Sequence, residues 1–230
     1  MVTGTTAMVM ITMTTDLLRL MTWLSPAFPV GGFAYSGGLE AAVREGHVGA
    51  VDELRDWLEM ALQQGQMRND AVLLTEAWHA HGDSKRLAEV ADLARSLAGS
   101  AERHLEITAQ GDAFVDAAVP WSPPSMEELE REMPYAVAVG VVAAANGIDL
   151  HATLVAWLHA LTSQAVSAAI RLGVLGQRDA MALLAELEPI LLDTAKWALT
   201  STPDALGSAT VIADILSARH ENLHSRLFRS

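Results

Sequence analysis

The spacing of apolar residues is the feature that most constrains how this chain can fold. Almost every segment repeats its apolar side chains every three or four residues, which places them on one face of an α-helix. In residues 52–65 the apolar positions are Leu54, Trp57, Leu58, Ala61 and Leu62. Alanine and leucine dominate, and no stretch alternates apolar and polar residues as a strand does. The pattern predicts an all-α fold, a single compact bundle of about eight to ten helices joined by short links.

Capping and breaking residues divide this pattern into individual helices. Helices are expected over residues 16–24, 39–43, 52–64, 71–79, 87–97, 102–119, 135–146, 150–172 and 179–199, with a last helix that runs toward Arg219. Asn69-Asp70 is expected to separate two helices, Gly111 to weaken one and Pro189 to interrupt another. Ser125 and Glu128 are predicted to form a capping box, in which the two residues satisfy the first backbone N–H groups of a helix.

The 230 residues are expected to form one helical domain with a shared core. Residues 1–15 carry no basic residue and lack the long apolar core of a secretory signal, so we expect a disordered extension there. Residues 16–218 are the predicted helical domain, and residues 219–230 are a C-terminal tail. Trp23 and Trp121 flank loops and are candidate interface residues.

The charge of the chain excludes several classes of partner. It has 28 acidic and 15 basic residues, a formal net charge of −13. Nucleic acids and anionic membrane surfaces both select a basic face, so we expect neither as a partner. The sequence has no cysteine, which excludes disulfides and thiolate metal sites. Residues 150–170 lack charged side chains, but His, Thr, Ser and Gln dilute them too heavily for a membrane span. We therefore expect a cytoplasmic protein.

The segment SPAFPVGGFAYSGGLE, residues 25–40, carries the strongest functional signal. It places prolines, two glycine pairs and aromatic rings between helical patterns, and such a loop loses much backbone freedom on folding. Loops of this kind usually occur where a ligand or partner approaches the backbone closely. A phosphate-binding loop is excluded because neither Lys85 nor Lys196 follows a glycine, and a dinucleotide site would need a preceding strand. We expect no cofactor.

Residues 220–224, HENLH, match the H-E-x-x-H motif, in which two histidines on one helical face hold zinc and the glutamate is a base. Catalytic zinc needs a third protein ligand, and no His, Asp or Glu follows His224. A helix at the extreme end of a chain is also a poor place for a site that excludes water. A zinc-dependent peptidase that uses His220, Glu221 and His224 is therefore an alternative that would need a third ligand from upstream. We predict no metal site and no catalytic residue.

The final residues, SRLFRS, alternate two arginines with an apolar pair on an otherwise acidic protein. From composition alone two interpretations are equally good. One is a frayed tail, and the other is a segment that becomes ordered by docking, with arginines and apolar residues as anchors.

Four blocks of sequence resemble those of UreF, a family of urease accessory proteins that act in nickel insertion. Residues 25–40 are similar to the family's SPxxPVGGFxYSxGLE segment, and residues 133–148 to its small-residue helix that ends in Gly-Ile. Residues 171–177 resemble its RLxxLGQ turn, and residues 220–230 its terminal HExxxSRLFRS. Together the blocks span most of residues 17–230.

The resemblance implies a non-catalytic, all-α scaffold that tends to form homodimers. Such a scaffold bridges the accessory protein UreD (also called UreH) and the nickel-carrying GTPase UreG, and the assembly docks on apo-urease. The residues implied to face the GTPase are Gly31, Gly32, Phe33, Tyr35, Ser36, Gly38, Leu39 and Glu40. Those implied for the docking tail are His220, Glu221, Arg226, Leu227, Phe228 and Arg229. Arg171 and Gln177 are implied to brace the fold nearby.

Within this interpretation, we expect the loop to present its backbone and the Tyr35 ring to the partner. A generic helical adaptor unrelated to urease is the other alternative, and such a protein would form no complex with UreD or UreG.

Overall fold

The computed structural model describes residues 14–122, 129 and 131–230, and every regular element in these residues is a helix. A first helix covers residues 14–23. The helices that follow are α2 (Leu39–Arg44), α3 (Val51–Gln64), α4 (Gln66–His79), α5 (Ser84–Ser96), α6 (Ala101–Ala118), α7 (Tyr135–Ala145), α8 (Leu150–Arg171), α9 (Gln177–Ala198) and α10 (Val211–Arg219). Short 3-10 helices are η1 (Gly32–Ala34), η2 (Val119–Trp121), η4 (Pro203–Ala205) and η5 (His220–Asn222). The predicted all-α bundle is confirmed.

α7 forms the centre of the bundle, where it packs against α4 and α6. Its residues 135–143 are all buried, because small apolar side chains surround the whole helix. Two glycines allow the close approach of the backbones. A Cβ atom added at Gly140 would lie 2.4 Å from the Leu74 carbonyl oxygen of α4, and one added at Gly111 would lie 1.7 Å from the Met133 carbonyl oxygen. Gly111 therefore lies inside a continuous α6 as a packing residue.

Gly140→Ala should destabilise the protein, because the α4 backbone would have to move to admit the new methyl group. In an exposed helix the same change adds about 1 kcal/mol of stability, so a loss of about 1–3 kcal/mol would report overpacking. Gly176→Ala is the control, because nothing lies within 4 Å of a Cβ added there. Urea unfolding followed by circular dichroism measures both variants. A Gly140→Ala protein as stable as the control would contradict this packing.

Two predicted helix breaks are wrong. Gly65 alone separates α3 from α4, so Asn69-Asp70 lies inside α4, where both side chains bind other segments. α9 continues through Pro189 although proline removes one backbone hydrogen bond. Its buried leucines hold it against α3 and α8 on both sides of the proline, and they are Leu183, Leu187 and Leu191.

The expectation that Trp23 is an interface residue is also wrong, since its side chain is fully buried. It packs edge-on against Phe114 and against the half-buried Trp121, at ring-centroid distances of 6.2 Å and 6.1 Å. Aromatic pairs prefer this geometry, and here they join the first helix to α6 and η2. The predicted capping box of Ser125 and Glu128 lies outside the residues that the structure describes.

α8 is long and apolar enough to cross a membrane by length and composition alone. However, 44% of its most apolar window is buried inside the protein, and α8 packs against α9 and α4. Leu154, Trp157 and Leu158 belong to the hydrophobic core. These contacts support the sequence-based interpretation of residues 150–170 as a core helix.

Candidate partner-binding site

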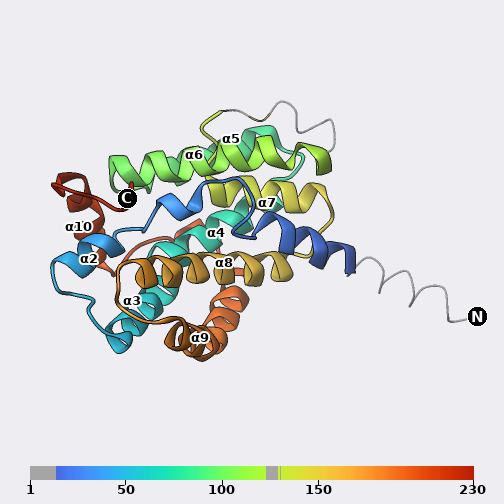
Figure 1. Cartoon of the computed structure of the whole chain (residues 1–230). Coiled ribbons are helices and arrows are strands. Elements are labelled where there is room, and N and C mark those ends of the chain that lie inside the picture. The colour runs from blue at the N-terminus through green and yellow to red at the C-terminus, as the bar shows by residue number, and fades with distance from the viewer. Residues whose placement is uncertain (1–13, 123–128, 130) are drawn as a thin grey trace, which may run out of the picture.

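The glycine-rich loop (residues 25–38) and the tail (residues 219–230) meet at one end of the bundle, beside α2 and α10 (Figure 1). The Arg229 N–H donates to the Ala34 carbonyl at 2.7 Å, and the Ser36 N–H donates to the Ser230 carbonyl at 2.8 Å. We call the exposed face of these two segments the loop–tail surface. In the structure of the single chain, the tail already packs against the chain's own loop.

Glycines shape the loop and seat it on α8. Gly31, Gly37 and Gly38 have φ values of 71°, 60° and 84°, a left-handed conformation that side chains disfavour. Gly32 lies so close to α8 that an added Cβ would be 2.6 Å from Gln164 Oε1. Gln164 Nε2 in turn donates to the Gly32 carbonyl at 2.7 Å. The loop backbone is therefore held in one position on the core.

Glu40, at the start of α2, attaches the tail to the domain. Its carboxylate is fully buried and accepts hydrogen bonds from the backbone N–H groups of Leu227 and Phe228, each at 2.9 Å. Arg44, one turn later, donates to the same carboxylate at 2.9 Å. Burial by itself raises the pKa of Glu40, but the hydrogen bonds from Leu227, Phe228, His220 and Arg44 outweigh it and hold the pKa below its ordinary value of 4.5.

His220 lies between two carboxylates that come from distant parts of the chain. Its Nε2 is 3.2 Å from Glu40 Oε2, and its Nδ1 is 2.8 Å from Glu102 Oε2 on α6. Glu102 also pairs with Arg226 of the tail. These residues form what we call the Glu40 cluster: Glu40, Arg44, Glu102, His220 and Arg226. Because its members come from α2, α6 and the tail, the cluster joins three segments that are far apart in sequence.

Arg171 connects the last residues of the tail to the loop. Its guanidinium lies 4.3 Å from the centre of the buried Phe228 ring, a cation–π contact, and it also donates to the Phe33 carbonyl. At the end of the tail, the buried Ser230 hydroxyl donates to Glu106 at 2.9 Å. Gln177, the other residue implied to brace the fold, is the exposed first residue of α9.

The structure divides the sequence-predicted site residues into two groups. The exposed ones are Phe33, Glu221, Arg226, Leu227 and Arg229. The buried ones are Gly32, Tyr35, Ser36, Gly38, Leu39, Glu40, His220 and Phe228, and Gly31 is half-buried. Tyr35 is only 5% exposed, so the expectation that its ring faces a partner does not fit this conformation, whereas the Phe33 ring is 74% exposed. The buried group holds the loop and tail in place, and the exposed group forms the surface.

Sequence reasoning missed Glu102, Glu106 and Arg44, which hold the tail with Glu40. The two glutamates lie in a segment correctly predicted as a helix, but no local motif marks them. Their partners in the tail are 118 and 124 residues away in sequence, so only the tertiary fold reveals these contacts.

The H-E-x-x-H residues do not share one helical face. η5 ends at Asn222, so His224 lies beyond it and is exposed, whereas His220 is buried within the Glu40 cluster. No group of three His, Cys, Asp or Glu side chains among the described residues is arranged to hold a metal ion. The motif therefore lacks the geometry that a zinc peptidase needs.

Comparison with known proteins identifies the family. The family model described as UreF matches residues 48–188. A urease accessory protein UreF of Agrobacterium fabrum is 55% identical over 214 residues, which cover 93% of this chain and 96% of that protein. The UreF of Sinorhizobium medicae is 51% identical over 217 residues, covering 94% and 97%.

The chain belongs to the UreF family. It is therefore a urease accessory protein with a role in urease maturation, and it is not an enzyme. The matched region of the family model lies between the loop and the tail, and the relatives align with more than nine-tenths of the chain.

Glu40→Gln should loosen the tail, because it removes the charge that accepts the tail's N–H groups. We expect a loss of about 2 kcal/mol of stability at neutral pH and faster tryptic release of the tail at Arg226. Because the pKa of Glu40 is lower in the folded state, its stabilisation is fully present above pH 4.5 and is lost as pH falls through the folded pKa. The stability difference between wild type and Glu40→Gln should therefore shrink at pH values below 4.5.

Glu45→Gln is the control, since Glu45 forms an exposed ion pair with Arg219 close to the same segments. Exposed pairs contribute little, so this variant should behave like the wild type. Equal protease resistance in the wild type and Glu40→Gln would contradict the role of Glu40.

Proposed function

We propose that this protein is a non-catalytic scaffold that bridges UreD (UreH) and the GTPase UreG, so that nickel is delivered to apo-urease. It would act in the cytoplasm as a homodimer. Membership of a family of urease accessory proteins supports the general role. The loop–tail surface supports the bridging, because it presents two segments of different chemistry side by side.

The observation that carries the proposal is the exposure of apolar side chains on a rigid backbone. The Phe33 side chain is 74% exposed, although Arg171 holds the Phe33 carbonyl, and Gln164 and the tail hold its neighbours in the loop. Leu227 is 50% exposed, although its N–H is bound to Glu40. An exposed aromatic side chain on an ordered backbone binds a partner with little loss of conformational entropy. We assign Phe33 and the loop to UreG, and Leu227, Arg226 and Arg229 of the tail to UreD.

Such a scaffold acts by differential binding. It lacks a phosphate-binding loop, so it would leave GTP hydrolysis to its partner. A scaffold favours a metal-delivering state of the GTPase only if it binds that state more tightly than the others. The fixed geometry of the loop–tail surface supports selection of this kind, since a rigid surface complements one partner conformation better than another.

Phe33→Ala should leave the fold intact and weaken recruitment of UreG by at least about tenfold, as expected when an exposed aromatic anchor is removed. Co-purification of UreG with the UreD-bound protein measures this. Leu192→Ala is the matched control, because Leu192 is similarly an exposed apolar residue but lies on α9. Normal UreG recruitment by the Phe33→Ala protein would contradict the assignment of the loop to UreG. A chain that bound neither UreD nor UreG would instead indicate the generic adaptor.

Deletion of residues 220–230 should impair the complex with UreD, as judged by size-exclusion chromatography. The deletion also removes the hydrogen-bond partners of the buried Glu40 and could destabilise the fold. A second variant therefore distinguishes loss of the binding surface from loss of stability. Leu227→Asp changes an exposed side chain but keeps the backbone N–H that binds Glu40. It should fold normally and still lose UreD. An unchanged complex with both variants would show that the tail is not the UreD-binding segment.

A further inference from the structure

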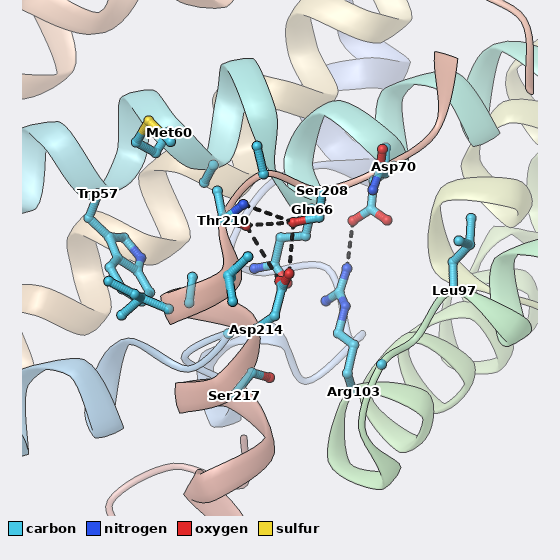
Figure 2. Close-up of a pocket in the computed structure, with 18 of the residues that line it drawn as sticks. Trp57, Met60, Gln66, Asp70, Leu97, Arg103, Ser208, Thr210, Asp214 and Ser217 are labelled. Atoms are coloured by element: carbon cyan, nitrogen blue, oxygen red, sulfur yellow. Dashed lines mark hydrogen bonds and ion pairs between the residues drawn. The ribbon is translucent and has the colours of Figure 1, made fainter. Parts of the chain in front are cut away.

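A separate groove, with a volume of about 740 Å³, lies between α3, the turn from α5 to α6, and α10 (Figure 2). One wall comes from α3, the floor from α4, and the opposite side from residues 207–217. Its apolar lining includes Trp57, Met60, Leu73, Leu97 and Ile212. A cavity of this size holds a small ligand or several side chains of a partner.

We propose that this groove is a second docking site, for an amphipathic helical segment of a partner protein that combines apolar anchors with flanking Lys or Arg side chains. The proposal goes beyond the function assigned to the loop–tail surface. It does not depend on which proteins bind there.

The shape of the groove fits a short helical segment. The lining residues of α3 run from Glu53 to Ala61, a length of about 12 Å at 1.5 Å per residue. This length matches about two turns of a partner helix, enough for anchors at positions i, i+3 or i+4, and i+7. Met60 and Leu97 at the edge are 44% and 42% exposed, and Ile212 on the α10 side is 60% exposed. These side chains would be covered by an occupant.

The charge of the groove specifies a basic occupant. Arg103 is already neutralised, because it contacts Asp70 at 2.6 Å and Glu106 at 3.1 Å. Three further carboxylates line the groove without an ion-pair partner among the described residues, and they are Glu53, Asp56 and Asp214. Of these, Glu53 caps α3 by accepting the Gly49 and Ala50 N–H groups, which leaves Asp56 and Asp214 as the carboxylates that face a basic occupant. Ser208 and Thr210 donate to Asp214 and hold it in place (Figure 2). A groove with unpaired negative charge around apolar walls selects partners with complementary positive charge.

The groove adjoins the loop through two glycines. Gly37 is one of its lining residues, and Gly38 packs so closely on α10 that an added Cβ would lie 3.1 Å from Ser217 Cα. An occupant of the groove would therefore contact α10 just before the tail begins. The two sites are neighbours, but they use different side chains.

A synthetic peptide of leucine and lysine at helical spacing, about 14 residues long and fluorescently labelled, is the probe. Fluorescence anisotropy with the full chain measures its affinity. The control peptide replaces every lysine by glutamate. We expect the lysine peptide to bind more tightly by at least about tenfold, and to weaken as salt rises from about 0.05 M to about 0.5 M.

Matched variants locate the peptide on the protein. Met60→Lys places a positive charge in the groove and should weaken binding by at least about tenfold. Met181→Lys, at a methionine that is 57% exposed on α9, should leave it unchanged. Phe33→Ala should also bind the peptide normally, which separates this site from the loop–tail surface. In methyl NMR spectra, the peptide should shift the Met60 signal and leave the Met181 signal in place.

Three results would each overturn the proposal. They are equal affinity of the Met60→Lys and Met181→Lys proteins, equal binding of the lysine and glutamate peptides, and no binding of the lysine peptide at all. Because Phe33→Ala tests the loop–tail surface independently, failure of either proposal leaves the other standing.

Discussion

The buried carboxylate of Glu40 is the interaction on which the candidate partner-binding end of this protein depends. An isolated buried charge costs several kcal/mol, so it is stable only when other groups satisfy it. Here the satisfying groups are two backbone N–H groups of the tail, the His220 ring and the Arg44 guanidinium. If the tail detached, the Glu40 carboxylate would either become exposed or remain buried without its hydrogen-bond donors. This requirement sets the path of the last residues.

The position of the tail in turn completes the loop. Ala34 and Ser36 exchange backbone hydrogen bonds with Arg229 and Ser230, so the loop is held by the tail on one side and by Gln164 of α8 on the other. With its backbone held in this way, the loop buries Tyr35 and exposes Phe33. The residues of the site fall into two groups: a buried group maintains the geometry, and a smaller exposed group is the one that we propose meets a partner.

α10 links this surface to the acidic groove. It packs against α2 and α6, lines the groove and leads directly into η5 and the Glu40 cluster. A partner bound in the groove would thus contact α10, the helix that leads into the tail of the loop–tail surface. Such an arrangement suits a scaffold that assembles several proteins, because each contact stabilises the helix that the other uses.

The sequence allowed most of the helices to be predicted, because a helix depends on the local 3.6-residue spacing of apolar side chains. The errors arose where tertiary contacts override local preference. Asn69-Asp70 and Pro189 lie within helices because distant segments bind or pack against them, and Trp23 is buried because α6 and η2 cover it.

By itself, the sequence determined the all-α fold and the two segments, residues 25–40 and 220–230, whose resemblance pointed to the UreF family. Only the tertiary structure decided which of their side chains reach the surface. It also revealed the roles of Glu102, Glu106 and Arg44, and the groove beside α10. The physical reason is distance along the chain: Glu40 and Phe228 are 188 residues apart, and no local pattern encodes a hydrogen bond between them.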